Sequence, residues 1–150
     1  MNLRNFSAAF ILLMAALFTI TSCGKDDEEV RQKVTNNITQ GTWRITNFDD
    51  DGEERKDQFD GYAFTFASNG TLTATKAGSP TQTGTWSITD GDENSDILDD
   101  LDFNISFPSA GEPFVFMNDD WDIVAYDSDE LDLSEVAGPL QTDLLSFQKN

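Results

Sequence analysis

Cys23 is the only cysteine in this 150-residue chain, and its position after an apolar run gives it a specific chemistry. Arg4 precedes the apolar segment 6–20, an order typical of a signal peptide. Ile20 and Ser22 place an apolar and then a small residue before the thiol, as in a lipoprotein cleavage site. The sequence therefore predicts a signal peptide over residues 1–22 and an acylated Cys23 that attaches the mature chain to a membrane.

An acidic stretch directly follows the predicted lipid-attachment site. It comprises Lys25, Asp26, Asp27, Glu28 and Glu29. A lysine followed by acidic residues resembles the export signal of surface-exposed lipoproteins in one group of Gram-negative bacteria. The resemblance implies a lipid-anchored outer-membrane protein exposed at the cell surface. The alternative is a solvated, lipid-anchored acidic spacer over residues 23–37, which would reach roughly 45 Å if fully extended.

Composition excludes several kinds of chemistry. The chain has 28 acidic residues, 9 basic residues and no histidine. Removing the signal peptide takes away only Arg4 from these groups, so the formal charge moves from −19 to about −20. Without histidine, and with the one thiol acylated, the commonest general base and the commonest zinc ligands are missing. We expect no cofactor, and nucleic acid is a poor partner for so negative a chain.

Period-two alternation of apolar and polar residues dominates from Gly41 onward and predicts an all-β domain. Eight runs show it: 41–46, 62–66, 71–75, 85–89, 101–107, 121–125, 131–133 and 145–147. Asn69-Gly70 between two of these runs predicts a hairpin with a tight primed turn. Eight short strands with one apolar face each close naturally into an antiparallel barrel, which removes exposed edges.

Helical signals are short. Val30, Val34 and Ile38 are spaced four apart, which predicts a short helical turn before the first strand. Glu112-Pro113-Phe114 begins a second possible turn, since proline fits the start of a helix. We expect both to have structural roles.

An ordered series of motifs over residues 38–150 resembles the bacterial lipocalin-like domain lipoproteins. The series is Gly41-Thr42-Trp43, Phe64–Leu72, Gly84-Thr85-Trp86-Ser87-Ile88, Trp121-Asp122-Ile123-Val124 and Leu144–Lys149. The resemblance implies an eight-stranded antiparallel lipocalin-like barrel in which Trp43 packs across the closed end near a basic side chain. The arginine expected after the last strand is missing, and Lys149 is the nearest candidate.

Eight aromatic residues face the interior in the predicted strands. They are Trp43, Phe64, Phe66, Trp86, Phe103, Phe107, Trp121 and Phe147. These rings either line a pocket for a small apolar or amphipathic ligand or fill the barrel, because eight strands leave an interior just wide enough for side chains. The first alternative predicts a ligand-binding protein. The second predicts an accessory or interaction module for a glycan or a partner protein.

Oxygen-rich segments raise the possibility of calcium. Asn47, Asp49 and Asp51-Gly52 begin like an EF-hand loop, but Gln58 stands where a bidentate glutamate is needed. A second segment has oxygen ligands at alternate positions without the turn glycine: Asp90, Asp92, Asn94 and Asp96. Solvated loop charge is the expected role of both segments, and the second is a weak alternative metal site.

Paired carboxylates are the remaining candidate for catalysis. Asp99-Asp100-Leu101-Asp102 and Asp119-Asp120-Trp121-Asp122 could each supply the acid pair of a glycosidase. Carboxylates are so abundant here that such pairs arise by chance, and a small barrel offers no long cleft. We expect a non-catalytic protein.

Overall fold

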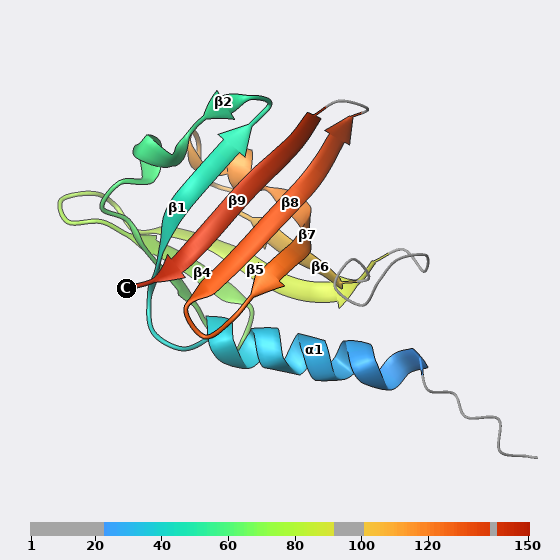
Figure 1. The fold of residues 1–150 in the computed structure, drawn as a ribbon. Helices are drawn as coiled ribbons and strands as arrows, with labels where there is room; N and C mark the ends of the chain where they lie inside the picture. The colour runs from blue at the N-terminus through green and yellow to red at the C-terminus, as the bar shows by residue number, and fades with distance from the viewer. Residues whose placement is uncertain (1–22, 92–100, 139–140) are drawn as a thin grey trace, which may run out of the picture.

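The computed structural model describes residues 23–91, 101–138 and 141–150. Eight strands pair in chain order, each antiparallel to the next. They are β1 (Trp43–Asp50), β3 (Ala63–Phe66), β4 (Thr71–Thr75), β5 (Gln82–Asp90), β6 (Leu101–Ser106), β7 (Asp119–Tyr126), β8 (Glu130–Gly138) and β9 (Gln141–Lys149). Strand β9 returns to pair with β1, so the sheet closes into the predicted eight-stranded barrel (Figure 1). The two-residue β2 (Glu53–Glu54) pairs only with β1.

Alternation along the strands places one face of each in the core, as predicted. In β6, for example, Leu101, Phe103 and Ile105 are buried and the intervening polar residues are partly exposed. Strand β1 departs from strict alternation, because an irregularity between Ile45 and Asn47 changes its register against β9. A bulge adds one residue to a strand and so reverses the facing of the side chains beyond it. Phe48 consequently points into the core.

The hairpin over residues 63–75 is confirmed, but its turn differs from the predicted primed type. Asn69 keeps a negative φ, and the chain turns through Ala67–Gly70, with the Gly70 N–H donating to the Ala67 carbonyl at 2.9 Å. Gly70, which has a φ of +81°, is the last residue of this longer loop. A two-residue turn with both φ values positive occurs instead between β1 and β2, at Asp51 (+56°) and Gly52 (+79°).

Residues 23–38 form helix α1 (Cys23–Ile38), where the sequence suggested a spacer and only a short helical turn. Val34 and Ile38 are each 1% exposed, and Val30 packs against the same cluster. Burial of these residues on the barrel stabilises a helix that its polar sequence alone would hold poorly. The segment is therefore an element of the folded unit. No helix in the described ranges is both long and apolar enough to cross a bilayer.

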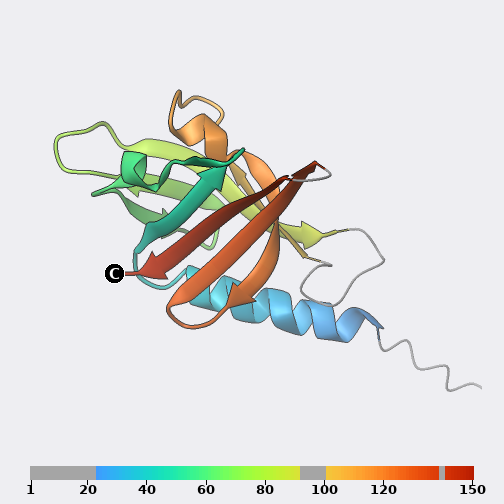
Figure 2. The ribbon, with the colours of Figure 1, turned by 45° about the horizontal axis from the view of Figure 1, so that its top comes forward.

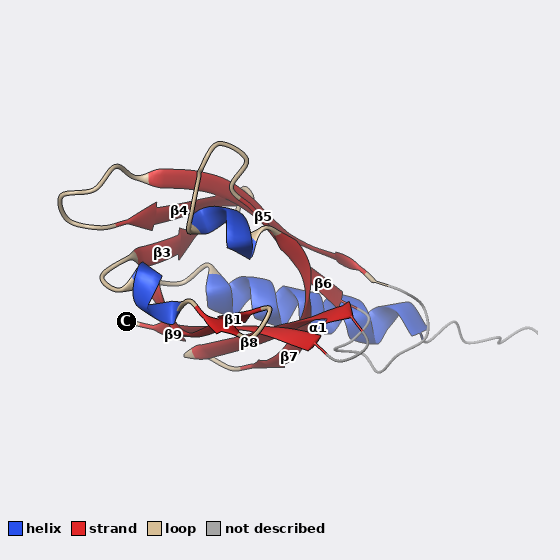
Figure 3. Cartoon of the chain, turned by 90° about the horizontal axis from the view of Figure 1, so that it is seen from above, coloured by secondary structure: helices blue, strands red, loops and turns tan. Residues whose placement is uncertain are grey.

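Helix α1 lies across one end of the barrel, here called the helix end, where β1 and β8 begin and β7 and β9 finish (Figures 1 and 2). Two single 3-10 turns, η1 (Lys56–Phe59) and η2 (Phe114–Met117), lie at the opposite end, here called the turn end. Figure 3 views the molecule from the turn end, with α1 on the far side. The second predicted helical turn is thus confirmed as η2.

Strands β1 and β3 join through a single register pair, Trp43 and Phe64, which leaves a seam between them toward the turn end. Phe59 of η1 fills this seam. Its ring centroid lies 5.6 Å from that of Phe48 on β1 and 6.1 Å from that of Phe64 on β3. The Arg55 N–H also donates to the Phe48 carbonyl at 2.8 Å, so η1 completes the wall where strand pairing stops.

Candidate functional site

All eight aromatic residues that the sequence assigned to the interior are buried there. The Phe66 ring lies 5.7 Å from Trp86, 5.9 Å from Phe103 and 5.4 Å from Phe147, centroid to centroid, and each pair meets edge to face. Trp86 stacks on Phe103 at 5.6 Å. Such edge-to-face and stacked geometries are the favoured contacts of packed aromatic rings. The middle of the barrel is therefore occupied by side chains in mutual contact.

Each tryptophan also satisfies its polar atom inside the fold. The Nε1–H of Trp43 donates to the Ile38 carbonyl at 2.9 Å, that of Trp86 to Ala67 at 2.9 Å, and that of Trp121 to Met117 at 3.1 Å. A buried indole N–H without a partner would cost free energy. These bonds fix the rings as parts of the core, and none of the three N–H groups points into the interior as a donor for a ligand.

Three further aromatic residues complete the core at the turn end and were not among the predicted interior positions: Phe48, Phe59 and Phe114. Phe114 meets Phe59 at 5.4 Å, Phe107 at 5.1 Å and the half-buried Tyr62 at 5.1 Å. Phe59 and Phe114 lie outside the alternating runs, so period-two patterning could not find them. Phe48 was hidden by the bulge in β1.

Trp43 has the basic neighbour that the resemblance implied. The Lys149 Nζ lies 5.2 Å from the centroid of the Trp43 ring and donates to the Ser128 carbonyl at 2.8 Å. The side chain of Lys149 also runs past Gly41, where the Cβ of any larger residue would meet it at 3.5 Å. Lysine replaces the expected arginine at this end, with a cation–π contact to the same ring.

The two Gly-x-Trp motifs require glycine for different physical reasons. Gly41 adopts a φ of +82°, which favours glycine. Gly84 lies within β5, where a Cβ would come within 2.3 Å of the Ser106 carbonyl and 2.8 Å of the Phe107 ring. The glycine at position 84 is thus required by close approach of β6, a common reason for glycine inside a strand.

Two carboxylates hold the turn between β1 and β2, one from the EF-hand-like segment and one from β9. Asp49 Oδ1 accepts a hydrogen bond from the Gly52 N–H at 2.9 Å, and Asp143 Oδ1 accepts one from the Asp51 N–H at 2.9 Å. Gln58, at the position of the missing glutamate, is exposed on η1. Among the residues that the structure describes, no group of three or more histidine, cysteine, aspartate or glutamate residues is arranged to hold a metal ion.

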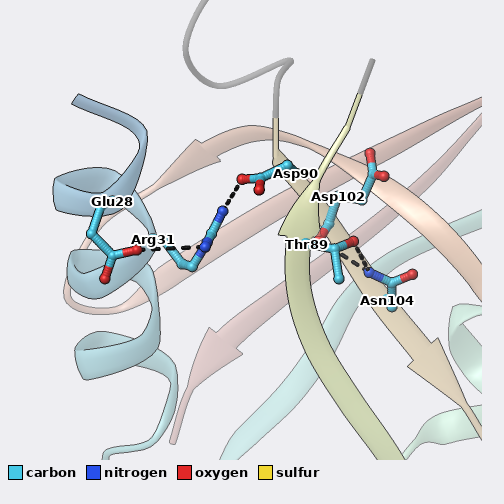
Figure 4. Close-up of polar contacts among 6 residues, drawn as sticks. All are labelled: Glu28, Arg31, Thr89, Asp90, Asp102 and Asn104. Carbon is cyan, nitrogen blue, oxygen red and sulfur yellow. Dashed lines mark hydrogen bonds and ion pairs between the residues drawn. The ribbon is translucent and has the colours of Figure 1, made fainter. Parts of the chain in front are cut away.

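Asp90, the first residue of the other candidate metal segment, forms an ion pair with Arg31 of α1 (Figure 4). The remaining residues of that segment, Asp92, Asn94 and Asp96, lie outside the described residues. Nearby, Asn104 Nδ2 donates to Thr89 Oγ1 at 2.9 Å, which ties the outer faces of β5 and β6 together. The described part of this segment thus serves contacts within the fold.

Carboxylates gather at the turn end of β7, β8 and β9, where the inward-facing side of these strands reaches the rim of the barrel. Glu135 and Asp143 are direct cross-strand partners. Partial burial raises the pKa of Glu135, and the charges of neighbouring aspartates, including Asp119 and Asp120, raise it further. Partial burial and a hydrogen bond with Asp120 likewise raise the pKa of Asp119. Both Asp119 and Asp120 are exposed.

The other predicted carboxylate pair lies only partly within the described ranges. Asp99 and Asp100 lie outside them, whereas Asp102 lies on β6 directly opposite Asp122 of β7. The predicted lipid-attachment residue Cys23 is the first residue of α1. Of the acidic stretch behind it, Glu29 forms an ion pair with Lys33 at 2.8 Å and Glu28 with Arg31 at 3.5 Å. The predicted signal peptide, residues 1–22, lies outside the described residues.

Together these features define a closed, eight-stranded antiparallel barrel with an aromatic core and an N-terminal helix across one end. No protein-family model matches the chain, and no curated protein matches it in sequence. Among solved structures, it is similar to the crystal structure of a DUF4847 family protein from Bacteroides vulgatus ATCC 8482, with 18% sequence identity and a TM-score of 0.49. The match covers 78% of this chain and 97% of that chain.

Proposed function

We propose that this chain is a lipid-anchored outer-membrane protein, exposed at the cell surface, whose filled barrel serves as a non-catalytic accessory or interaction module. The observation that carries the proposal is the packed interior. Phe66 contacts rings from three other strands, and rings also close the turn end. A partner, whether a glycan or a protein, would then bind the outer surface of the barrel.

A cup for a small apolar ligand is the competing function. To form one, the interior rings would have to leave their edge-to-face contacts. Each such pair contributes about 0.5–1.5 kcal/mol beyond the burial of its apolar area. Phe66 alone makes three of these contacts, so opening a chamber around it would cost several times that amount. The interaction module requires no such rearrangement.

The anchor and the charge of the chain restrict the partner. Acylation of Cys23 would give several acyl chains at one position, enough for stable attachment to a membrane. The mature chain carries a formal charge of about −20, which disfavours nucleic acids and other polyanions. Neutral glycans and proteins with neutral or basic surfaces remain as partners.

Acyl labelling in cells tests the anchor. Cys23→Ala should abolish incorporation of labelled palmitate, because no other thiol exists in the chain. Ser22→Ala is the matched control, since it keeps a small residue before Cys23 and should label normally. Continued labelling of Cys23→Ala would contradict the anchor.

Protease shaving of intact cells tests the surface location. Replacing residues 25–29 with neutral residues should protect the protein from added protease if this stretch directs export. Membrane attachment should persist in the same variant, which separates failed export from failed anchoring. If the protease digests this variant as readily as the wild type, residues 25–29 do not direct export and act only as a spacer.

Binding of an apolar fluorescent probe, measured together with urea unfolding, distinguishes the filled barrel from a cup. We expect no saturable binding by the wild-type protein. Phe66→Trp should overpack the core and lower the free energy of unfolding by about 1–3 kcal/mol. Val124→Ala, at a side chain 53% exposed on the barrel wall, is the control and should change stability little. Saturable binding that Phe66→Trp weakens at unchanged stability would establish a cup instead.

A further inference from the structure

Helix α1 is fastened to the barrel at points that are spaced along its second half. Val34 and Ile38 are buried against the helix end, and the Ile38 carbonyl accepts the Trp43 Nε1–H at 2.9 Å. Asn37 Nδ2 donates to the Asp127 carbonyl in the turn between β7 and β8 at 3.0 Å. These contacts join α1 to β1 and to the β7–β8 hairpin, and they fix the direction of the helix axis across the barrel.

Arg31 supplies a further contact closer to the N-terminus of α1. Its guanidinium reaches Asp90 at the end of β5 and also pairs with Glu28, one helical turn earlier, at 3.5 Å (Figure 4). The side chain of Arg31 is 28% exposed and its Nε is buried, so the stem packs against the protein while the charged head spans the gap. The Arg31–Asp90 pair thereby joins α1 to the β5–β6 side of the barrel.

The short segment before Arg31 limits how far the barrel can stand from a membrane. Arg31 follows Cys23 by eight positions, which is about 12 Å at the helical rise per residue. An extended, flexible spacer over residues 23–37 would instead permit roughly 45 Å and any orientation. Because the helix is held at Arg31, Val34 and Ile38, the barrel keeps a fixed position and orientation relative to the first residue of the helix.

We infer that α1 is a rigid arm, latched to β5 by the Arg31–Asp90 pair, that holds the helix end of the barrel toward the lipid surface and the turn end away from it. This inference rests on the proposed acylation of Cys23. It adds a fixed orientation to the proposed anchor, and it names Arg31 as a positioning residue. The surface available to an outside partner is then the turn end and the part of the barrel wall next to it.

Energy transfer to a labelled bilayer tests the orientation in the acylated full-length mature protein. Because acylation consumes the Cys23 thiol, one introduced cysteine can carry a donor dye. Asp129→Cys places the dye at the helix end, and Gln58→Cys places it at the turn end; both positions are exposed. The protein is bound to phosphatidylcholine vesicles that contain an acceptor-labelled lipid.

We expect at least about twofold higher transfer from position 129 than from position 58, since the ends of such a barrel lie about 20–25 Å apart. Arg31→Ala should reduce this difference and speed hydrogen exchange of the α1 amides before Val34 by about two- to fivefold, the range that one partly exposed ion pair supports. Asp90→Arg should act more strongly, because it places like charges together. The double variant Arg31→Glu/Asp90→Arg should restore the difference.

Lys33→Ala is the matched control. It removes an ion pair with Glu29 within the same helix and leaves the Arg31–Asp90 contact in place, so the transfer difference should persist. Equal transfer from both positions in an acylated wild-type protein would overturn the fixed orientation and leave the anchor standing. A difference that survives both Arg31→Ala and Asp90→Arg would overturn the latch. Failure to find acyl chains by mass spectrometry would instead refute the proposed anchor itself.

Discussion

At the helix end of the barrel a 16-residue helix lies across the strands, whereas at the turn end two single 3-10 turns bring rings into the mouth. The helix end combines two buried aliphatic residues with hydrogen bonds and an ion pair between distant parts of the chain. At the turn end, Phe59 and Phe114 pack on rings of the barrel itself. The turn end is therefore closed by segments between strands, while closure of the helix end depends on a segment outside the barrel.

The two ends also differ in their charge. At the helix end the carboxylates of Glu28 and Asp90 share Arg31. At the turn end Glu135 and Asp143 face each other across the strands, and the pKa of Glu135 is raised. Ion pairs are present at both ends, since Arg55 beside η1 pairs with Asp50 at 2.5 Å and with Glu53 at 3.0 Å. The difference teaches that an ion pair between distant segments helps to attach α1, whereas at the turn end ring packing and local ion pairs stabilise the fold against repulsion between carboxylates.

The largest effect is expected from removing the ring that joins α1 to the barrel. Trp43→Ala should lower the free energy of unfolding by about 3–5 kcal/mol, because it deletes a buried ring and leaves the Ile38 carbonyl without its donor. Urea melts measure the loss, and hydrogen exchange should show α1 loosened with it. Trp43→Phe is the control, since it keeps a ring and should lose less. A loss below about 1 kcal/mol would mean that the helix end does not depend on this ring.

A comparable but more local effect is expected at the turn end. Phe114→Ala should cost about 3 kcal/mol, because it removes ring contacts with Phe59, Tyr62 and Phe107. The amides of α1 should keep their protection relative to the rest of the barrel. Val115→Ala, at the neighbouring residue with 43% exposure, is the control and should be nearly neutral. Selective loosening of α1 by Phe114→Ala would show that the two ends are not independent.

A smaller loss of stability is expected from adding a side chain at Gly84, where β5 lies close to β6 near the turn end. Gly84→Ala should cost about 1–3 kcal/mol, because its Cβ would meet the Ser106 carbonyl and push Phe107 toward Phe114. The melting temperature of this variant is compared with that of Gly111→Ala. Gly111→Ala is the control, since a Cβ at Gly111 meets nothing within 4 Å. Equal melting temperatures for the two variants would argue against a tight approach of β5 and β6.

The smallest effect is expected from relieving the carboxylate repulsion. Glu135→Gln should stabilise the protein at pH 7 by about 0.2–1 kcal/mol, because it removes a partly buried charge that is also repelled by neighbouring aspartates. Because the folded state raises the pKa of Glu135, the folded protein binds more protons than the unfolded chain just above the ordinary pKa of a glutamate. The contribution of Glu135 to wild-type stability should therefore rise as pH falls from 7 through this range.

The variant should lose part of that pH dependence, so its advantage over the wild type should shrink toward the ordinary pKa of a glutamate. Unfolding by urea at a series of pH values measures both quantities. Glu130→Gln, at an exposed residue near the helix end of β8, is the control. If Glu135→Gln and Glu130→Gln give the same pH profile, burial and repulsion at Glu135 are together too weak to affect stability.

Alternating residues in the sequence were enough to predict the strands of the barrel and its eight interior aromatic residues. That pattern is local, since a strand with one buried face repeats every two residues. It does not extend through a bulge, which is why Phe48 was missed, and it contains no information about Phe59 or Phe114 in the connections. The turn at Asn69-Gly70 illustrates the same limit, because the hairpin is encoded locally while its turn type depends on loop length and strand register.

The candidate site was predicted less completely than the fold. Interior aromatic residues have the same sequence pattern whether they line a pocket or fill a core, so the choice between a cup and a packed barrel was open. Only ring-to-ring distances such as those around Phe66 favour the packed barrel. The role of Asp143 in the β1–β2 turn was likewise invisible, because its partner, the Asp51 N–H, lies 92 positions away and is reached only when β1 and β9 become neighbours.

The sequence by itself determined that this is an all-β barrel with an acidic surface, because patterning and charge are properties of the residue order. It also predicts the lipid-attachment residue Cys23 from a short motif. Only the tertiary structure decided that residues 23–38 form a helix held to the barrel, because Arg31 and Asp90 are 59 positions apart and meet only when β5 reaches the helix end. Contacts between such distant residues arise from chain topology, which no local pattern contains.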